Sequence, residues 1–168
     1  MARAGTSTDG EVAANSASAR PIFPKGPSML TGIDPLLTGD LLRILDHMGH
    51  NDTLLITDAH YPSHAMGAPV IDLAVTSPEA VRAVRTVLPV DVYAGPSVTL
   101  MTPEPGTGEE VQVQLQESAA ARADRLEWID RFDFYERGRG VFAVLRTLET
   151  RKYGCVMLRK GVVGDDEG

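Results

Sequence analysis

The fold of this chain is constrained most by short apolar runs, each bounded by polar residues and too short for a buried helix. Residues 53–57 (TLLIT) form one such run, and residues 70–75 form a second. Runs of this kind are typical of strands that are covered on both faces. Residues 97–101, 141–146 and 153–159 are further β-rich runs, the last two separated by a polar segment. The sequence therefore predicts a strand at each run, with a turn between the last two.

Helical patterns alternate with these runs. Thr38 can cap a helix whose apolar residues recur at helical spacing, and Gly49 would close it. Residues 77–79 (SPE) begin another helix, with a capping hydroxyl, a proline at the first helical position and an acid in the first turn. Residues 109–124 and 132–139 also have helical patterns. The alternation predicts an α/β fold, a layered sheet with helices on both faces, in a single domain.

The chain divides into an N-terminal extension and one domain. Its 168 residues suffice for one hydrophobic core. Residues 1–28 are dominated by Ala, Gly, Ser, Thr and Pro, with Phe23 as their one aromatic residue. Because such a segment buries too little apolar area to offset the entropy of ordering, we expect a flexible extension over residues 1–28 and a domain over residues 29–168. The extension also lacks the apolar stretch of a secretory signal, so we expect a cytoplasmic location.

Charge and composition argue against several classes of partner. The formal net charge is −7, with 23 acidic against 16 basic residues, so the surface should repel phosphate backbones. No apolar run approaches the roughly 18 residues of a membrane span. The single cysteine, Cys155, cannot form an internal disulfide. We therefore expect no nucleic acid and no membrane as partner.

The sequence lacks common nucleotide and hydrolase motifs, but its histidines are clustered. There is no Gly-x-Gly-x-x-Gly after a strand, no Walker loop and no Gly-x-Ser-x-Gly elbow, and we expect no cofactor. All four histidines lie between residues 47 and 64. His50 lies on the loop between the first helix and the first strand, where a histidine can move protons to and from a substrate oxygen without a metal. The alternative is a solvated loop residue, as we expect for His47, which lies off the apolar stripe of its helix.

A metal site is a further alternative. His60 and His64 are four residues apart, and Asp58 could add an oxygen ligand. Pro62 lies between the two histidines and disfavours the helix that would align them. We therefore predict no metal site and keep metal-assisted chemistry as an alternative.

Two later segments combine aromatic rings with hydrogen-bonding groups. They are residues 131–137 (RFDFYER) and residues 152–155 (KYGC). An aromatic face beside such groups suits a sugar, although similar segments also form cores and surface ion pairs.

Six segments, spread over residues 29–163 or about four fifths of the chain, together resemble a known family. In order, they are Pro35-Leu36-Leu37, Met48-Gly49-His50, Asp58-Ala59-His60-Tyr61-Pro62, His64-Ala65-Met66-Gly67, residues 131–137 and Lys152-Tyr153-Gly154. The chain resembles the fucose mutarotase and ribose pyranase (RbsD/FucU) family, and Asp58-Ala59-His60 is similar to the fucose branch. The resemblance implies an RbsD-like fold and an isomerase that acts on the anomeric centre of an aldose such as L-fucose. It also implies ring-shaped homo-oligomers, commonly decamers, with sites at subunit interfaces.

The resemblance implies particular site residues. They are His50 as the catalytic residue, Asp58 and Arg131 as sugar contacts, and Tyr153, Gly154 and Cys155 in the place of the family's Tyr-Gly-Asn binding segment. Cys155 replaces an amide by a weakly hydrogen-bonding thiol, so altered sugar specificity is expected. Asn51 stands where the family usually has Gly, and Asn also tolerates a left-handed backbone. A non-catalytic sugar-binding or regulatory subunit on the same fold is the alternative function.

The spacing of His50 and Asp58 constrains how a site could use both. If residues 53–57 are extended at about 3.3 Å each, the two side chains lie roughly 20 Å or more apart in one subunit. One monosaccharide could not touch both. Either the segment bends sharply, or the site combines His50 from one subunit with Asp58 from its neighbour.

Overall fold

The computed structural model describes residues 30–164, so the predicted extension, residues 1–28, lies outside the described residues. Its centre is a 6-stranded sheet with the strand order β2-β5-β1-β6-β3-β4. The strands are β1 (Thr53–Thr57), β2 (Val70–Leu73), β3 (Val98–Met101), β4 (Leu126–Ile129), β5 (Ala143–Thr147) and β6 (Val156–Arg159). The helices are α1 (Gly39–His47), α2 (Ser77–Arg85), α3 (Glu109–Ala119) and α4 (Arg131–Gly138), with short 3-10 turns at η1 (Ser63–Met66) and η2 (Ala123–Arg125).

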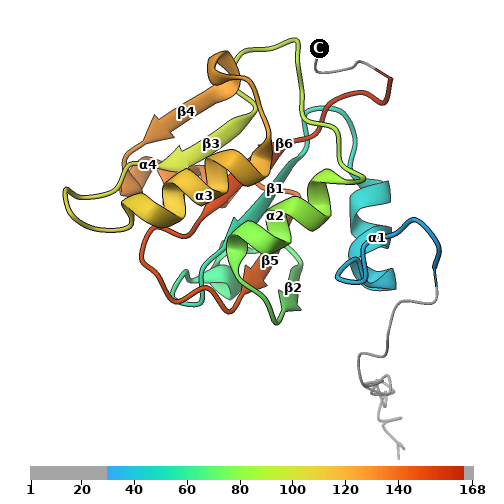
Figure 1. Ribbon diagram of the computed structural model, residues 1–168, viewed down its shortest axis with the longest axis horizontal. Helices are drawn as coiled ribbons and strands as arrows, with labels where there is room; N and C mark the ends of the chain where they lie inside the picture. Colours follow the sequence, from blue (N-terminus) through green and yellow to red (C-terminus); the bar gives the residue numbers. More distant parts are fainter. Residues whose placement is uncertain (1–29, 165–168) are drawn as a thin grey trace, which may run out of the picture.

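The sheet is mixed, and its direction changes at β6. Strands β1, β2 and β5 run parallel to one another, and β3 runs parallel to β4. Strand β6 lies between β1 and β3 and is antiparallel to both. The carboxyl ends of β1, β3 and β4 therefore meet the amino end of β6 at one edge of the sheet (Figure 1).

Helices cover both faces of the sheet, as predicted. Helices α1, α2 and α3 lie on one face, and α4 lies on the other (Figure 1). Leu54 and Ile56 of β1 pack into the larger core with α1 and α2, whereas Leu55 packs with Phe134 of α4. Successive residues of a strand point to opposite faces, so the apolar run of β1 needs cover on both sides. The sequence prediction for residues 53–57 is confirmed.

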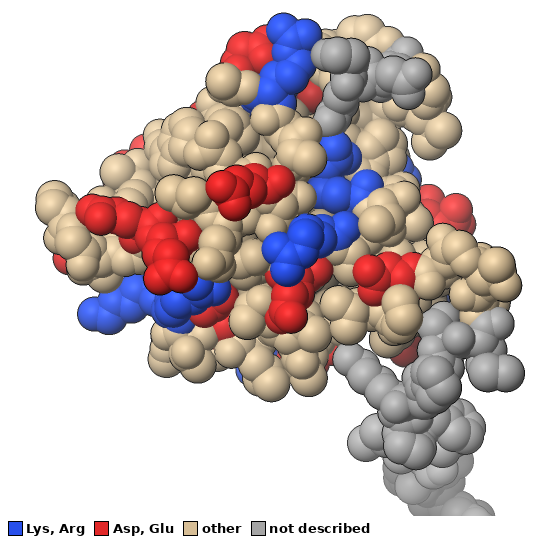
Figure 2. All heavy atoms as spheres, in the orientation of Figure 1, with Lys and Arg blue, Asp and Glu red and all other residues tan. Residues whose placement is uncertain are grey.

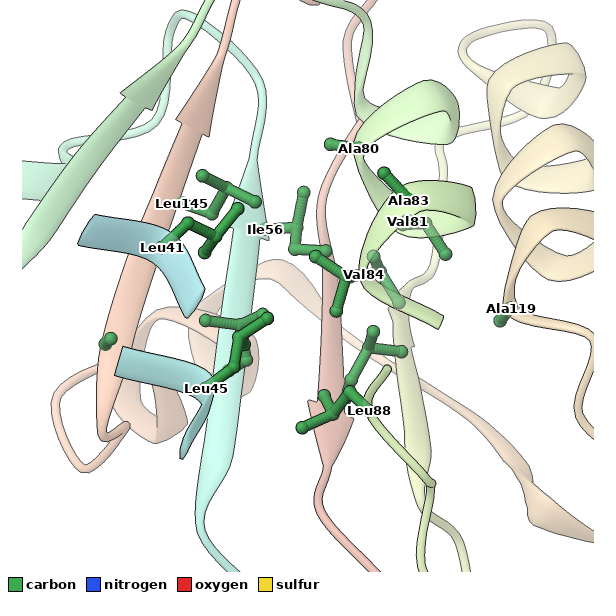
Figure 3. Packing of buried hydrophobic residues seen from close by; sticks show 14 of the residues in the cluster. Leu41, Leu45, Ile56, Ala80, Val81, Ala83, Val84, Leu88, Ala119 and Leu145 are labelled. Atoms are coloured by element: carbon green, nitrogen blue, oxygen red, sulfur yellow. The ribbon is translucent and has the colours of Figure 1, made fainter. Parts of the chain in front are cut away.

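The larger core is built from facing apolar stripes (Figure 3). Leu41 and Leu45 of α1 point towards Ile56 and Leu145 in the sheet, and Val84 of α2 lies against the same face. Neither helix could bury its stripe alone, so the sheet and the helices depend on each other for stability.

The first turns of α1 and α2 are capped by side chains as predicted, but the capping residue of α2 lies one position earlier. The backbone N–H of Leu41 donates to Thr38 Oγ1 at 3.3 Å, which confirms Thr38 as the cap of α1. Helix α2 is capped by Thr76 and not by Ser77, because Thr76 and Glu79 form a reciprocal capping box. Helix α1 ends at an extended Met48, so Gly49 does not act as a left-handed cap.

Two strand predictions need correction, and one strand was not predicted at all. Strand β2 is an edge strand whose Asp72 is exposed, so residues 70–75 are not covered on both faces. Strands β5 and β6 are not paired with each other, since β1 lies between them. Strand β4 was not predicted, because its LEWI sequence at an edge of the sheet has no run of buried residues.

Charges of both signs are mixed on the face that carries α2 and α3 (Figure 2). None of the helices in residues 30–164 is long and apolar enough to cross a membrane.

Truncation of Leu41 tests the dependence of α1 on the sheet. Leu41 has 0% exposure, so Leu41→Ala should lower the free energy of unfolding by about 2–5 kcal/mol through lost burial and a cavity. Leu148→Ala is the control: Leu148 is 64% exposed, so its truncation should change the free energy of unfolding by less than about 0.5 kcal/mol. Urea denaturation of both variants measures the difference, and equal effects would contradict this account of the core.

Candidate functional site

A cavity of about 310 Å³ opens at the edge of the sheet where the strand directions meet. This volume lies at the lower end of the roughly 300–1,000 Å³ that ligand pockets occupy. The cavity is lined by Asp58, His60, Tyr61, Met101, Glu104, Arg131, Tyr135, Lys152, Tyr153 and Cys155. Four of the six residues implied by the family resemblance are among them, and Gly154 adjoins Asp58 directly.

The sheet topology explains why these residues meet. Asp58 follows the last residue of β1, and Arg131 follows β4 after one cap residue. Residues 153–155 lead into β6, which runs in the opposite direction. Antiparallel pairing places the amino end of β6 beside the carboxyl ends of β1 and β3. Residues that are almost 100 positions apart in the sequence thus line one cavity.

Asp58 is held firmly at the cavity wall. Its Oδ1 accepts the backbone N–H groups of His60 at 3.0 Å and Tyr61 at 2.9 Å. Its own N–H donates to the Cys155 sulfur at 3.3 Å. These contacts fix a carboxylate that is buried but lines the cavity, which suits it to accept hydrogen bonds from ligand hydroxyls.

The segment before β6 has a constrained backbone. Tyr153 adopts a left-handed conformation with φ 64°, which is uncommon for an aromatic residue, and its carbonyl accepts a hydrogen bond from the Gln112 side chain. A Cβ atom on Gly154 would lie 2.6 Å from Cγ of Glu149. Glu149 cannot easily yield, because Arg151 binds its carboxylate at 2.9 and 2.7 Å. The close approach therefore requires glycine at position 154.

The opposite wall carries a cation and a phenol. Arg131 is exposed at the start of α4, with Cζ 5.0 Å from the centroid of the Phe132 ring, and within residues 30–164 it forms no ion pair. Burial raises the pKa of Tyr135, so its hydroxyl stays protonated and can donate a hydrogen bond. Burial of Cys155 likewise raises the pKa of its thiol well above the usual value, so it stays a thiol.

His50 lies at the other end of β1, away from this cavity. It precedes β1, whereas Asp58 follows it, and the strand is continuous over its five residues without the sharp bend left open by the sequence. His50 Nε2 lies 3.0 Å from Oδ1 of the buried Asp91, whose other oxygen accepts Arg159 Nη2 at 2.9 Å. The rings of His50 and Tyr93 form a T-shaped pair, with centroids 6.4 Å apart. The structure thus brings together the predicted sugar contacts and leaves the predicted catalytic histidine elsewhere on the same subunit.

Comparison with known proteins agrees with the sequence resemblance. Residues 31–163 match the RbsD / FucU transport protein family. The chain belongs to the RbsD/FucU family. L-Fucose mutarotase from Histophilus somni (strain 2336) is 34% identical over 140 residues, which cover 80% of this chain and 97% of that protein.

Solved structures of the RbsD/FucU family share the fold. The fucose mutarotase from Streptococcus pneumoniae, in complex with L-fucose, matches with a TM-score of 0.72 and 31% identity over 80% of this chain and 99% of that one. RbsD from Bacillus subtilis, complexed with D-ribose, matches with a TM-score of 0.66 and 23% identity over 76% and 95% of the two chains. The expected RbsD-like fold is confirmed.

Two other cavities of this RbsD/FucU protein are weaker candidates. One of about 440 Å³ contains Asp72 and Arg146, which are paired with each other at 2.6 Å. Another of about 270 Å³ contains Glu127 and Arg137, which also form an ion pair. Because these charged side chains already have partners, a charged ligand would have to break an ion pair in order to bind.

The metal alternative gains no support from the geometry. No group of three or more His, Cys, Asp or Glu residues within residues 30–164 is arranged to hold a metal ion. His60 Nε2 lies 3.3 Å from the Thr150 carbonyl, and His64 is exposed on η1. His47 is exposed on α1, as predicted.

Several site residues of this RbsD/FucU protein were not predicted individually. Glu104 lines the cavity from the loop after β3, and Asp91 binds His50 from the loop before β3. Neither residue belongs to a motif or a periodic pattern in the sequence. Tyr135 lies within an aromatic segment that was singled out, but without a role of its own.

Gly154 provides a test of the packing behind the cavity. Gly154→Ala should destabilise the protein by about 1–3 kcal/mol, because the new methyl group overlaps Glu149 and the Arg151 carbonyl. Gly140→Ala is the matched control, since the nearest atom to its Cβ would be 3.7 Å away. Thermal unfolding followed by circular dichroism measures both. A Gly154→Ala variant as stable as Gly140→Ala would show that the segment can move.

Proposed function

We propose that this protein is a mutarotase that interconverts the α and β anomers of a free monosaccharide, with L-fucose or a related aldose as the substrate. The observation that carries the proposal is the convergence of Asp58, Arg131 and residues 153–155 on one cavity. A fixed carboxylate, an available guanidinium and aromatic rings suit the hydroxyls and faces of a sugar. The related fucose mutarotase that was solved with L-fucose supports the same substrate class.

The chemistry needs only a proton acceptor and a proton donor. Mutarotation removes the proton from the anomeric hydroxyl and protonates the ring oxygen, so that the ring opens to an aldehyde and closes again on the other face. In our proposal His50 performs both transfers, because an imidazole can accept and return a proton near neutral pH. Asp58 and Arg131 orient the sugar through charge-assisted hydrogen bonds. Arg131 is not the base, because its guanidinium keeps its proton near neutral pH and cannot accept another.

The proposed site combines two subunits. His50 and the cavity lie at opposite ends of β1, and a single sugar cannot bridge roughly 20 Å. His50 is accessible to a neighbour, since its side chain is 42% exposed. We propose a ring-shaped homo-oligomer, a decamer as in the family resemblance, in which His50 of one subunit faces the cavity of the next. A head-to-tail contact that repeats around a ring meets this requirement.

Removal of His50 should slow catalysis strongly without loss of the fold. His50→Ala should reduce the rate of anomer interconversion by about 10²-fold or more, the usual contribution of general acid-base catalysis. Exchange NMR on equilibrated L-fucose and D-ribose measures the rate. His47→Ala, at an exposed position of α1, is the matched control and should keep the rate. A His50→Ala variant with the full rate would refute the assigned role.

Mixed oligomers test whether the site is shared. His50→Ala and Arg131→Ala should each be impaired alone, but co-expressed chains should recover about a quarter of the activity, since random assortment completes one interface in four. Native mass spectrometry verifies the mixing. If verified mixed oligomers show no recovery, or if a folded monomer is active in sedimentation and rate assays, the shared site is wrong.

The alternative is a non-catalytic sugar-binding or regulatory subunit, and Cys155 favours it. Cys155 is 1% exposed, and its sulfur accepts the Asp58 N–H instead of offering an amide to the sugar. Sugar binding measured by calorimetry, with no faster anomer exchange by NMR, would support this alternative over the mutarotase.

Restoring the usual family residue should change the specificity. Cys155→Asn should raise kcat/KM for L-fucose relative to D-ribose by about tenfold, if the amide gains one hydrogen bond worth ~1.4 kcal/mol to a hydroxyl that differs between the two sugars. Cys155→Ser, which is close in size to cysteine, controls for loss of the thiol. An unchanged ratio in a folded Cys155→Asn variant would show that position 155 does not select the sugar.

A further inference from the structure

A buried carboxylate lies behind the cavity and takes no part in the chemistry described above. Glu149 belongs to the segment that joins β5 to β6, and its side chain is 2% exposed. It is not among the residues that line the cavity. A buried carboxylate is costly unless it is paired and hydrogen-bonded, so the partners of Glu149 show what it holds in place.

Arg151 satisfies this carboxylate. Its Nε donates to Oε1 of Glu149 at 2.9 Å and its Nη2 donates to Oε2 at 2.7 Å, which is a bidentate contact. The backbone N–H of Arg151 also donates to Oε1, at 2.9 Å. The hydrogen bonds from Arg151 lower the pKa of Glu149 although burial opposes ionisation, so the pair stays charged near neutral pH.

Glu149 contacts both of the segments that carry the expected sugar contacts. Its backbone carbonyl accepts the N–H of Ala59, the residue after Asp58, at 2.8 Å. Its Cγ packs directly against Gly154, since a Cβ atom there would lie 2.6 Å from it. The Cβ atom of Asp58 would lie 3.3 Å from the same point. A shift of Glu149 would therefore disturb both Asp58 and residues 153–155.

Arg151 also ties this part of the chain to helix α3. Its Nη1 donates to Oε1 of Gln114 at 3.0 Å, while the side chain of Gln112 donates to the carbonyl of Tyr153. Tyr153 has a left-handed backbone, which is costly for a residue with a Cβ atom and persists only where contacts hold it. The side chain of Arg151 is 35% exposed, so it contributes these contacts rather than burial in the core.

We propose that Glu149 and Arg151 are positioning residues for sugar binding: as a pair braced against α3, they hold residues 153–155 in the conformation that contacts the sugar. The inference rests on the proposed function. Neither side chain exchanges a proton, because the carboxylate and the guanidinium are occupied by each other. Residues 153–155 contact the sugar before and during ring opening. The pair therefore acts on the affinity for the sugar and not on the proton transfers.

The Arg151→Ala variant removes the pairing without changing a residue of the cavity. Glu149 is then buried without its partner, and residues 153–155 lose their tie to α3. We expect KM for L-fucose to rise about tenfold while kcat changes by less than about twofold, since binding is lost equally in the ground and transition states. Glu149→Gln keeps the side-chain volume behind Gly154 and loses only the charge, so KM should rise about threefold.

A double variant and a surface control make the test specific. If Glu149 and Arg151 act as a pair, Glu149→Gln combined with Arg151→Ala should raise KM about tenfold, as Arg151→Ala does alone, because the second change removes a contact that is already lost. Independent effects would multiply to about thirtyfold. Arg122→Ala is the matched control, since this 63% exposed arginine is paired with Asp124 on the surface, and it should leave KM and kcat unchanged.

Hydrogen exchange of the full-length protein, followed by mass spectrometry without sugar, reports the positioning directly. In Arg151→Ala the amides of residues 149–155 should exchange about tenfold faster than in the wild type, because the segment opens more often. The amides of β1 should keep their rate, since the core of the sheet is unchanged.

The outcomes are distinguishable. A folded Arg151→Ala variant with the KM and the exchange rates of the wild type, or one whose kcat falls while KM stays the same, would overturn the positioning role. If the wild type accelerates no sugar, the proposed mutarotase is wrong and the effect on KM falls with it, but the exchange rates still decide whether the pair holds residues 149–155. If Arg151→Ala fails to fold, Glu149→Gln decides the question by the same two measurements.

Discussion

The antiparallel pairing of β6 with β1 and β3 is the interaction on which the rest of the molecule depends. Without it, the chain would form two separate parallel pieces, β2-β5-β1 and β3-β4. Because β6 runs against its neighbours, the segment that precedes it reaches the edge where β1, β3 and β4 end. The same pairing carries Arg159 to the opposite edge, where it meets Asp91 and His50. One strand thus supports both halves of the proposed chemistry.

Local patterns in the sequence predicted two kinds of element: those that are stabilised by contacts between nearby residues, and those that are fully buried. Strand β1 agrees with the prediction to the residue, because a run buried on both faces has no polar interruption. The cap at Thr38 and the start of α2 follow from side chains within four residues of each other. Edge strands are harder to predict, since half of their surface faces solvent. Strand β4 shows this, with Glu127 and the exposed Trp128 within its four residues.

The cavity was predictable only in part. Asp58, Arg131 and residues 153–155 came from the family resemblance, and periodicity alone would not have joined segments so far apart. Asp91 shows the limit more clearly. It is 41 residues from His50, lies between two valines and has no spacing that marks it. Only the tertiary fold shows that this carboxylate is buried against the histidine.

The burial of the Cys155 thiol in the cavity wall determines how it reacts with oxidants and alkylating reagents. Thiolates, not thiols, react with oxidants and alkylating reagents. Cys155 is 1% exposed, burial raises its pKa, and its sulfur is occupied by the N–H of Asp58. Reagents would reach it only after the start of β6 separates from the end of β1. The thiol therefore takes part in the hydrogen bonding of the cavity wall without giving the cavity a redox-sensitive group.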